Sequence, residues 1–140
     1  MTRRLGAARS LAALLLVTGS LHFVVPAPFD AIVPGFLGAP RLWTYASGVA
    51  ELACAAGLLV PRTRRAAGWA CAALFVAVFP ANLQMAVDAL RGDGSVLVSL
   101  LRLPLQVPLV VCAVYVARTP ADPADGTARP GRQPNRSARW

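Results

Sequence analysis

Four apolar stretches, each long enough to cross a lipid bilayer, occupy most of the 140-residue chain. They are Leu5–Val25, Leu42–Val60, Ala66–Leu90 and Val96–Ala117. A spanning helix needs about 20 mainly apolar residues at a rise of about 1.5 Å each. Lipid cannot hydrogen-bond a bare backbone, so only helices or closed barrels cross it, and continuous apolar runs without alternation favour helices. The sequence therefore predicts an all-α fold, a bundle of four transmembrane helices.

Little of the chain is left for anything other than the membrane domain. Only 14% of the residues are charged, whereas a soluble domain usually has about a quarter. We expect a single membrane domain over residues 1–117. Residues 118–140 are rich in proline, arginine and small polar side chains, a composition typical of a disordered tail.

The net charge of +8 comes from fourteen arginines, most of which flank the apolar stretches. Three arginines precede the first stretch, three lie between the second and third, and five follow the fourth. These are Arg3, Arg4 and Arg9, then Arg62, Arg64 and Arg65, then Arg118, Arg129, Arg132, Arg136 and Arg139. The other two junctions carry Arg41 and Arg91 beside Asp30 and Asp93. The positive-inside rule then predicts a plasma-membrane protein with both termini in the cytoplasm.

The basic residues have two other interpretations, a nucleic-acid-binding surface and a secretory signal. A charge of +8 in a soluble protein would suggest nucleic acid, but no aromatic-and-basic face or binding motif is present, so nucleic acid is not an expected partner. Met1–Val17 also resembles a secretory signal, whose removal would leave three spans and the same later orientation. Against removal, the apolar stretch continues to Val25, and no small-x-small cleavage site follows directly.

Small residues and prolines predict how the helices pack. The second stretch is crowded with alanine and glycine from Ala46 to Gly57, which lets helix backbones approach closely in lipid and predicts a place at the bundle centre. Gly68 and Ala72 give the third stretch a similar edge. Pro80 should interrupt the third helix because its ring removes a backbone donor. The proline-rich linker Pro26–Arg41 cannot form one regular helix and should lie at the membrane interface or partly re-enter the membrane.

Polar side chains inside the apolar stretches are the candidate site, because charges in hydrocarbon are strongly unfavourable. At about 1.5 Å per residue, Glu51 lies near mid-membrane and Arg102 about 9 Å from the start of the fourth stretch. We expect these two residues to pair, since either charge alone is destabilising at that depth. Gln106, one turn from Arg102, and Asn82 complete a polar pocket that opens to the outside. His22 and Gln84 are secondary candidates for this pocket.

The role of the expected Glu51–Arg102 pair stays open at the level of sequence. The pair can fix the register of two helices, or it can form part of a ligand, quinone or proton site. Alternatively, Arg102 extends to the interface and meets no partner.

The motifs of known chemistries are missing from the sequence. No phosphate loop, nucleotide fingerprint, zinc spacing or Ser/His/Asp set occurs, so no catalytic residue, metal site or cofactor is predicted, and association with a quinone is left open. Cys54, Cys71 and Cys112 lie in three different stretches without a C-x-x-C pair, which predicts a packing role. The sequence indicates a protein that is not an enzyme on its own.

Several short motifs in chain order resemble the DoxX-like family of small bacterial membrane proteins. They are His22-Phe23-x-x-Pro26, Ile32-Val33-Pro34, Tyr45-x-Ser47-Gly48-Val49-x-Glu51, Gly57-Leu58-Leu59-x-Pro61-x-Thr63-Arg64-Arg65-x-Ala67-x-Trp69, Val78-Phe79-Pro80-Ala81-Asn82-Leu83-x-Met85-Ala86 and Arg102-x-Pro104-Leu105-Gln106. The resemblance covers about residues 18 to 115. It implies a four-helix protein of the bacterial inner membrane and includes the positions of the expected polar cluster.

The resemblance also implies a class of function. Better-known DoxX-like proteins are linked to membrane oxidoreductase assemblies, among them the small subunit of a thiosulfate:quinone oxidoreductase. A distant branch acts in receptor assembly. The first hypothesis is therefore a non-catalytic membrane subunit or anchor of a redox or quinone-linked complex. The alternatives are an assembly factor for other membrane proteins and a small-solute transporter, with an oxidoreductase partner, another membrane protein or a second copy as the expected contact.

Overall fold

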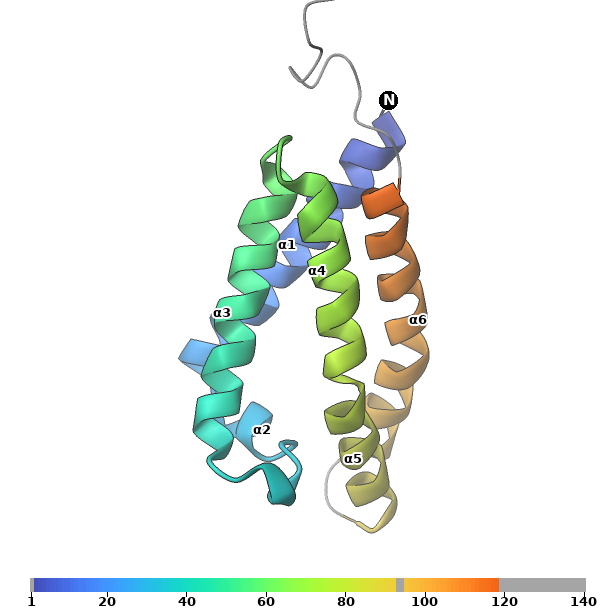
Figure 1. Ribbon diagram of the computed structural model, residues 1–140. Helices are drawn as coiled ribbons and strands as arrows, with labels where there is room; N and C mark the ends of the chain where they lie inside the picture. Colours follow the sequence, from blue (N-terminus) through green and yellow to red (C-terminus); the bar gives the residue numbers. More distant parts are fainter. Residues whose placement is uncertain (1, 93–94, 119–140) are drawn as a thin grey trace, which may run out of the picture.

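The computed structural model describes residues 2–92 and 95–118, and the regular structure in these ranges is helical (Figure 1). Four helical segments are long and apolar enough to cross a membrane, which confirms the predicted fold class. Their elements are α1 (Thr2–Val24), α3 (Pro40–Leu59), α4 (Arg64–Ala77) joined to α5 (Phe79–Leu90), and α6 (Val96–Arg118). The helix ends lie within three residues of the predicted ones. The predicted disordered tail was 118–140; Arg118 is the last residue of α6, and 119–140 lie outside the described residues.

The four segments form an up-and-down bundle in which each packs against two neighbours. Helix α1 contacts α3 and α6, and α4 contacts α3 and α6. The start of α1, the turn between α3 and α4 and the end of α6 lie at one end of the bundle (Figure 1); we call this the terminal end. Short connections favour such antiparallel neighbours. The expectation that the small-residue helix α3 occupies the centre is wrong, because α3, like the other spans, packs mainly against two neighbours, α1 and α4.

The hydrophobic core fills the half of the bundle nearest the terminal end. Leu15, Leu58, Cys71 and Val116 come from four different segments, and each is almost fully buried. Small side chains such as Ala55, Ala67 and Ala113 pack between them. Without a hydrophobic driving force between helices in lipid, such close packing supplies much of the attraction. The bundle is therefore closed at its terminal end.

Pro80 interrupts the third span as predicted. Helix α4 ends at Ala77 and α5 begins at Phe79, with Val78 between them. The backbone N–H of Val78 still donates to Leu74 (3.0 Å), and the Val78 carbonyl accepts from Asn82 (3.1 Å). Proline supplies no backbone donor of its own, so the Val76 carbonyl, four residues before Pro80, lacks its regular helical partner. By contrast, α6 runs unbroken through Pro104 and Pro108.

Two arginines at the terminal end bind the ends of helices. The buried Arg64 donates from Nε to the Leu58 carbonyl (2.9 Å) and from Nη2 to the Leu59 carbonyl (3.4 Å), at the end of α3. Arg4 of α1 donates from Nε to the Val116 carbonyl in α6 (3.3 Å). Cations near a helix C-terminus also interact favourably with the helix dipole. These arginines therefore tie neighbouring helices together.

The linker between α1 and α3 folds back against the bundle. It contains two short helical turns, α2 (Ala27–Asp30) and η1 (Gly35–Leu37), which agrees with the expectation that no regular helix fills it. The Asp30 carboxylate accepts from the Thr44 hydroxyl (2.6 Å) and from Arg41 Nε (2.8 Å). We call Asp30, Arg41 and Thr44 the linker clasp. It fixes the linker to the first turns of α3.

The linker clasp should loosen in acid. The Thr44 hydrogen bond, helped by Arg41, holds the pKa of Asp30 below its ordinary value, although desolvation acts in the opposite direction. A carboxylate whose pKa is lower in the folded state stabilises that state fully above the unfolded pKa. The stabilisation is lost as pH falls through the folded value, so we expect loosening below about pH 4. Fluorescence of Trp43, whose indole N–H donates to the Leu37 carbonyl (3.3 Å), reports the change in a Trp69→Phe, Trp140→Phe background.

The matched control for the acid response is Asp30→Asn in the same background. This variant should show a loosened linker at neutral pH and no further change on acidification. An acid transition of Trp43 that is identical with and without Asp30 would contradict the role of the clasp.

Candidate functional site

A cavity of about 600 Å³ lies in the half of the bundle opposite the terminal end. Its walls come from α1, α3, α4, α5, α6 and the linker. Helices α3 and α4 diverge from their shared turn toward the end where α2 lies (Figure 1). Linker side chains, among them Phe29, Val33 and Leu37, form part of the lining. The volume falls within the range of small-molecule sites, about 300 to 1,000 Å³.

One wall of the cavity carries a polar cluster from α1 and α3. The Thr18 hydroxyl donates to Glu51 Oε2, and His22 Nε2 lies 4.0 Å from Glu51 Oε1. His22 Nδ1 is bonded to the Thr18 carbonyl (2.7 Å), and the imidazole stacks on Phe29 with ring centroids 3.9 Å apart. We call Thr18, His22 and Glu51 the acidic wall. It joins two candidates from the sequence, Glu51 and His22, through Thr18.

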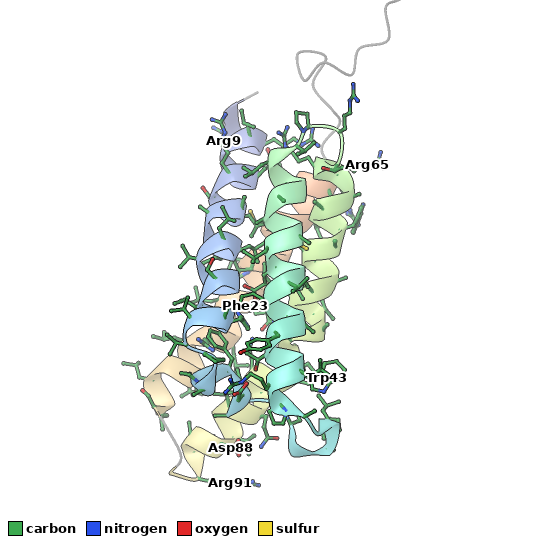
Figure 2. The ribbon with its side chains drawn as sticks, turned by 90° about the vertical axis from the view of Figure 1, so that its left-hand side faces the viewer. Arg9, Phe23, Trp43, Arg65, Asp88 and Arg91 are labelled. Atoms are coloured by element: carbon green, nitrogen blue, oxygen red, sulfur yellow. The ribbon has the colours of Figure 1, made fainter. Side chains whose placement is uncertain are left out.

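A close approach of α1 and α3 places this wall. A Cβ atom added at Gly48 would lie 2.7 Å from the Phe23 ring and 2.8 Å from His22 Cβ. Only glycine therefore allows α3 to pack this tightly beside His22. The Phe23 ring stacks with Tyr45 one turn further along (centroids 5.3 Å apart). In Figure 2, the labelled Phe23 lies between the ribbons of α1 and α3.

The opposite wall is built around Gln106 of α6, and we call Asn82 and Gln106 the amide wall. Asn82 Nδ2 donates to Gln106 Oε1 (2.6 Å), and Gln106 Nε2 donates to the Phe75 carbonyl. Gln106 is buried, and the Phe75 carbonyl belongs to the last turn of α4, just before the interruption that Pro80 causes. The expected proximity of Asn82 and Gln106 is therefore confirmed.

Arg102 lines the same cavity but does not pair with Glu51, so the expected ion pair is wrong. Arg102 is exposed, and its Nη1 atom contacts Met85 Sδ at 3.7 Å. Within the described ranges, the acidic side chains with a basic side chain within 4.0 Å are Glu51, beside His22, and Asp30, beside Arg41. The physical reason is the helix order: α3 and α6 lie diagonally across the bundle, whereas α1 packs directly on α3.

A double-mutant cycle checks this correction. Glu51→Gln combined with Arg102→Leu should give a coupling energy below about 0.5 kcal/mol, because groups that share no contact act additively. The cycle of Glu51→Leu with Thr18→Val should instead show coupling of about 0.5–2 kcal/mol, since the wild-type residues share a hydrogen bond that either change removes. Unfolding in mixed micelles, followed by circular dichroism, measures both. Strong coupling between Glu51 and Arg102 would restore the original ion pair.

Gln84, the remaining candidate, lies away from the cavity. Its side-chain amide donates to Asp88 of the same helix at 2.8 and 3.0 Å. Asp88 and Arg91 are labelled at the linker end of the bundle in Figure 2. Thr18 and the linker residues of the lining were not predicted from the sequence. A Thr18-x-x-x-His22 spacing, which puts both side chains on one helix face, was the available signal for Thr18.

The site offers hydrogen bonding and proton exchange within an apolar setting. Most of its lining residues are apolar, such as Leu14, Ile32, Leu105 and Leu109. In the part of the chain that the structure describes, no three or more His, Cys, Asp or Glu side chains are grouped to hold a metal ion. Cys54 and Cys71 are buried free thiols in the core. The arrangement suits recognition of an amphipathic molecule.

Comparison with known proteins identifies a family without a described activity. A family model described as a domain of unknown function (DUF8561) matches residues 11–117, so the chain belongs to this family. No curated protein and no solved structure matches the chain.

Proposed function

We propose that this DUF8561 protein is a non-catalytic membrane subunit or anchor of a redox or quinone-linked complex. The observation that carries the proposal is the cavity, which lies within an apolar bundle and has polar groups on two facing walls. Such a cavity suits a lipophilic molecule that carries hydrogen-bonding groups. The resemblance of the motifs around Glu51, Asn82 and Gln106 to the DoxX-like family supports the same assignment.

The outer surface of α3 offers a place for a partner helix. Val49, Ala53 and Ala56 are exposed along this face, and small side chains let another transmembrane helix approach closely. This surface supports a membrane-protein partner and equally a second copy of the chain. The surface therefore supports the anchor role with either kind of partner.

Copurification tests the proposed role. The tagged protein is extracted from its native membrane with a mild detergent, and proteins that copurify are quantified against an unrelated four-helix membrane protein expressed at the same level. We expect a redox subunit to be enriched in near-stoichiometric amount. Ala53→Leu with Ala56→Leu should reduce this enrichment if the face of α3 is used. Absence of any oxidoreductase component would reject the proposal.

An assembly factor is the second candidate, supported by the same small-residue face of α3. Deletion of the gene should then lower the abundance of one specific client, and an unchanged membrane proteome would exclude this role. A transporter is less favoured, because the core around Leu15, Leu58 and Val116 closes the terminal half of the bundle.

We further propose that both termini face the cytoplasm. Arg9 and Arg65 lie at the terminal end, opposite Asp88 and Arg91 (Figure 2), and the positive-inside rule assigns the arginine-rich end to the cytoplasm. Alkaline phosphatase, which is active only outside the cytoplasm, should be active when fused after Gly92 and inactive when fused after Arg62. The reverse pattern would invert the topology.

A further inference from the structure

We infer that the cavity binds a lipophilic molecule whose head carries a hydroxyl group, and that this hydroxyl lies between Glu51 and His22. The inference deepens the proposed function, because it supplies the membrane subunit with a ligand of defined chemistry. It is tested on the isolated protein, so its failure is distinguishable from a failure to find a redox partner.

The acidic wall holds two polar atoms that face each other without bonding. The side chains of His22 and Glu51 are only 8% and 13% exposed, and His22 Nε2 lies 4.0 Å from Glu51 Oε1. This distance exceeds that of a hydrogen bond. The remaining polar atoms of the two side chains are engaged: Nδ1 with the Thr18 carbonyl and Oε2 with the Thr18 hydroxyl. Each side chain therefore contributes one atom that is available to a ligand in the cavity.

A hydroxyl group matches these two atoms. An oxygen about 2.8 Å from each can lie beside the 4.0 Å line that joins them, which is normal hydrogen-bond distance. The Thr18 carbonyl can only accept, so His22 Nδ1 carries a proton and neutral His22 presents an accepting Nε2. A hydroxyl donates one bond and accepts another, so it can serve neutral His22 with protonated Glu51 or protonated His22 with ionised Glu51. A carbonyl or ether oxygen, which only accepts, cannot donate to either atom.

The rest of the cavity requires the molecule to be lipophilic. About 600 Å³ is available, and the lining around the acidic wall includes Leu14, Ile32, Val33 and Leu109. Burial of apolar area contributes about 25 cal/mol per Å². Asn82 and Gln106 face the same space, but their amides already bond each other. The acidic wall is therefore the part of the cavity that selects the head group.

A set of three probes tests the hydroxyl without altering the protein. The protein in lipid nanodiscs is titrated with p-decylphenol, with its methyl ether p-decylanisole and with dodecanol, and the midpoint of thermal unfolding is followed. A ligand that binds the folded state raises this midpoint. We expect p-decylphenol to bind about tenfold more tightly than the ether, the effect of one lost hydrogen bond in a buried site. If dodecanol binds as tightly as p-decylphenol, the natural ligand carries an aliphatic lipid hydroxyl. If dodecanol binds more weakly, the natural ligand carries an aromatic hydroxyl.

Variants then locate the hydroxyl. Glu51→Leu and His22→Phe should each reduce phenol binding to the level of the ether, whereas Gln84→Leu, outside the cavity, should leave it unchanged. If either cavity variant fails to fold, the relative affinity of p-decylphenol and p-decylanisole for the unaltered protein tests the inference by itself. Equal binding of phenol and ether, no binding of any probe, or unchanged discrimination in a folded Glu51→Leu variant would overturn the inference.

Discussion

Gly68→Ala should destabilise the bundle by up to about 2 kcal/mol, because α4 and α6 cross at this residue with their backbones in contact. A Cβ atom at Gly68 would lie 2.9 Å from the Ala117 nitrogen and 3.0 Å from both the Ala113 oxygen and Ala117 Cα. Backbone atoms cannot rotate away as a flexible side chain does, so the helices must separate. Overpacking of this kind typically costs about 1–3 kcal/mol, from which the better helix propensity of alanine, about 1 kcal/mol, is subtracted.

The matched control for Gly68→Ala is Gly6→Ala. Gly6 also lies in a helix, but a Cβ atom there meets nothing within 4 Å. This substitution should be neutral or stabilise the protein by up to about 1 kcal/mol. Thermal unfolding in detergent, followed by circular dichroism, compares the two. If Gly68→Ala is as stable as Gly6→Ala, the close crossing of α4 and α6 is wrong.

The crossing of α4 and α6 was predicted in part from the sequence. Gly68 and Ala72 predicted a close-packed edge on the third span, and this edge is buried as expected. The sequence did not identify the partner helix, although Ala113 and Ala117 repeat the same four-residue spacing on the fourth span. Spacing shows which face can approach another backbone, while the choice of neighbour depends on how all four helices close into one bundle.

The spans themselves were predictable because bilayer thickness fixes the length of an apolar helix. The interruption at Pro80 also followed from local chemistry, since proline removes a donor wherever it stands. The partner of Glu51 did not follow in this way. Depth along the membrane normal placed Arg102 at a suitable level, but depth carries no information about which helices adjoin. Thr18 bonds Glu51, and His22 lies 4.0 Å from it, because α1 packs directly beside α3.

The sequence also did not predict that the linker lines the cavity. Four prolines in the linker excluded a regular helix, and the apolar side chains suggested the membrane interface. Fixation of the linker depends on one carboxylate, Asp30, that reaches both Arg41 and Thr44 in the first turns of α3. Such contacts are set by the path of the chain between α1 and α3. Apolar linker residues such as Ile32 and Val33 thereby become part of a site instead of an interface anchor.

Gln106→Leu should destabilise the protein by about 1–3 kcal/mol, because Gln106 links three segments through two hydrogen bonds. The Phe75 carbonyl lies in the last turn of α4, just before the interruption at Val78, and Gln106 Nε2 donates to it. The same side chain accepts from Asn82. Hydrogen bonds inside membrane proteins contribute about 0.6 kcal/mol on average and up to about 1.7, and groups left buried without partners add to the loss.

The control uses the same substitution at Gln84, whose amide bonds only Asp88 on its own helix among the residues that the structure describes. Gln84→Leu should change stability by less than about 0.5 kcal/mol. Asn82→Leu should be less harmful when Gln106→Leu is already present, with a coupling energy of about 0.5–1.7 kcal/mol. If Gln106→Leu and Gln84→Leu lower the free energy of unfolding equally, the hydrogen bonds from Gln106 do not stabilise the interruption in the third span. A clear difference would instead mean that the proline in one span and the glutamine in another form a single structural unit, which also holds the amide wall of the cavity in place.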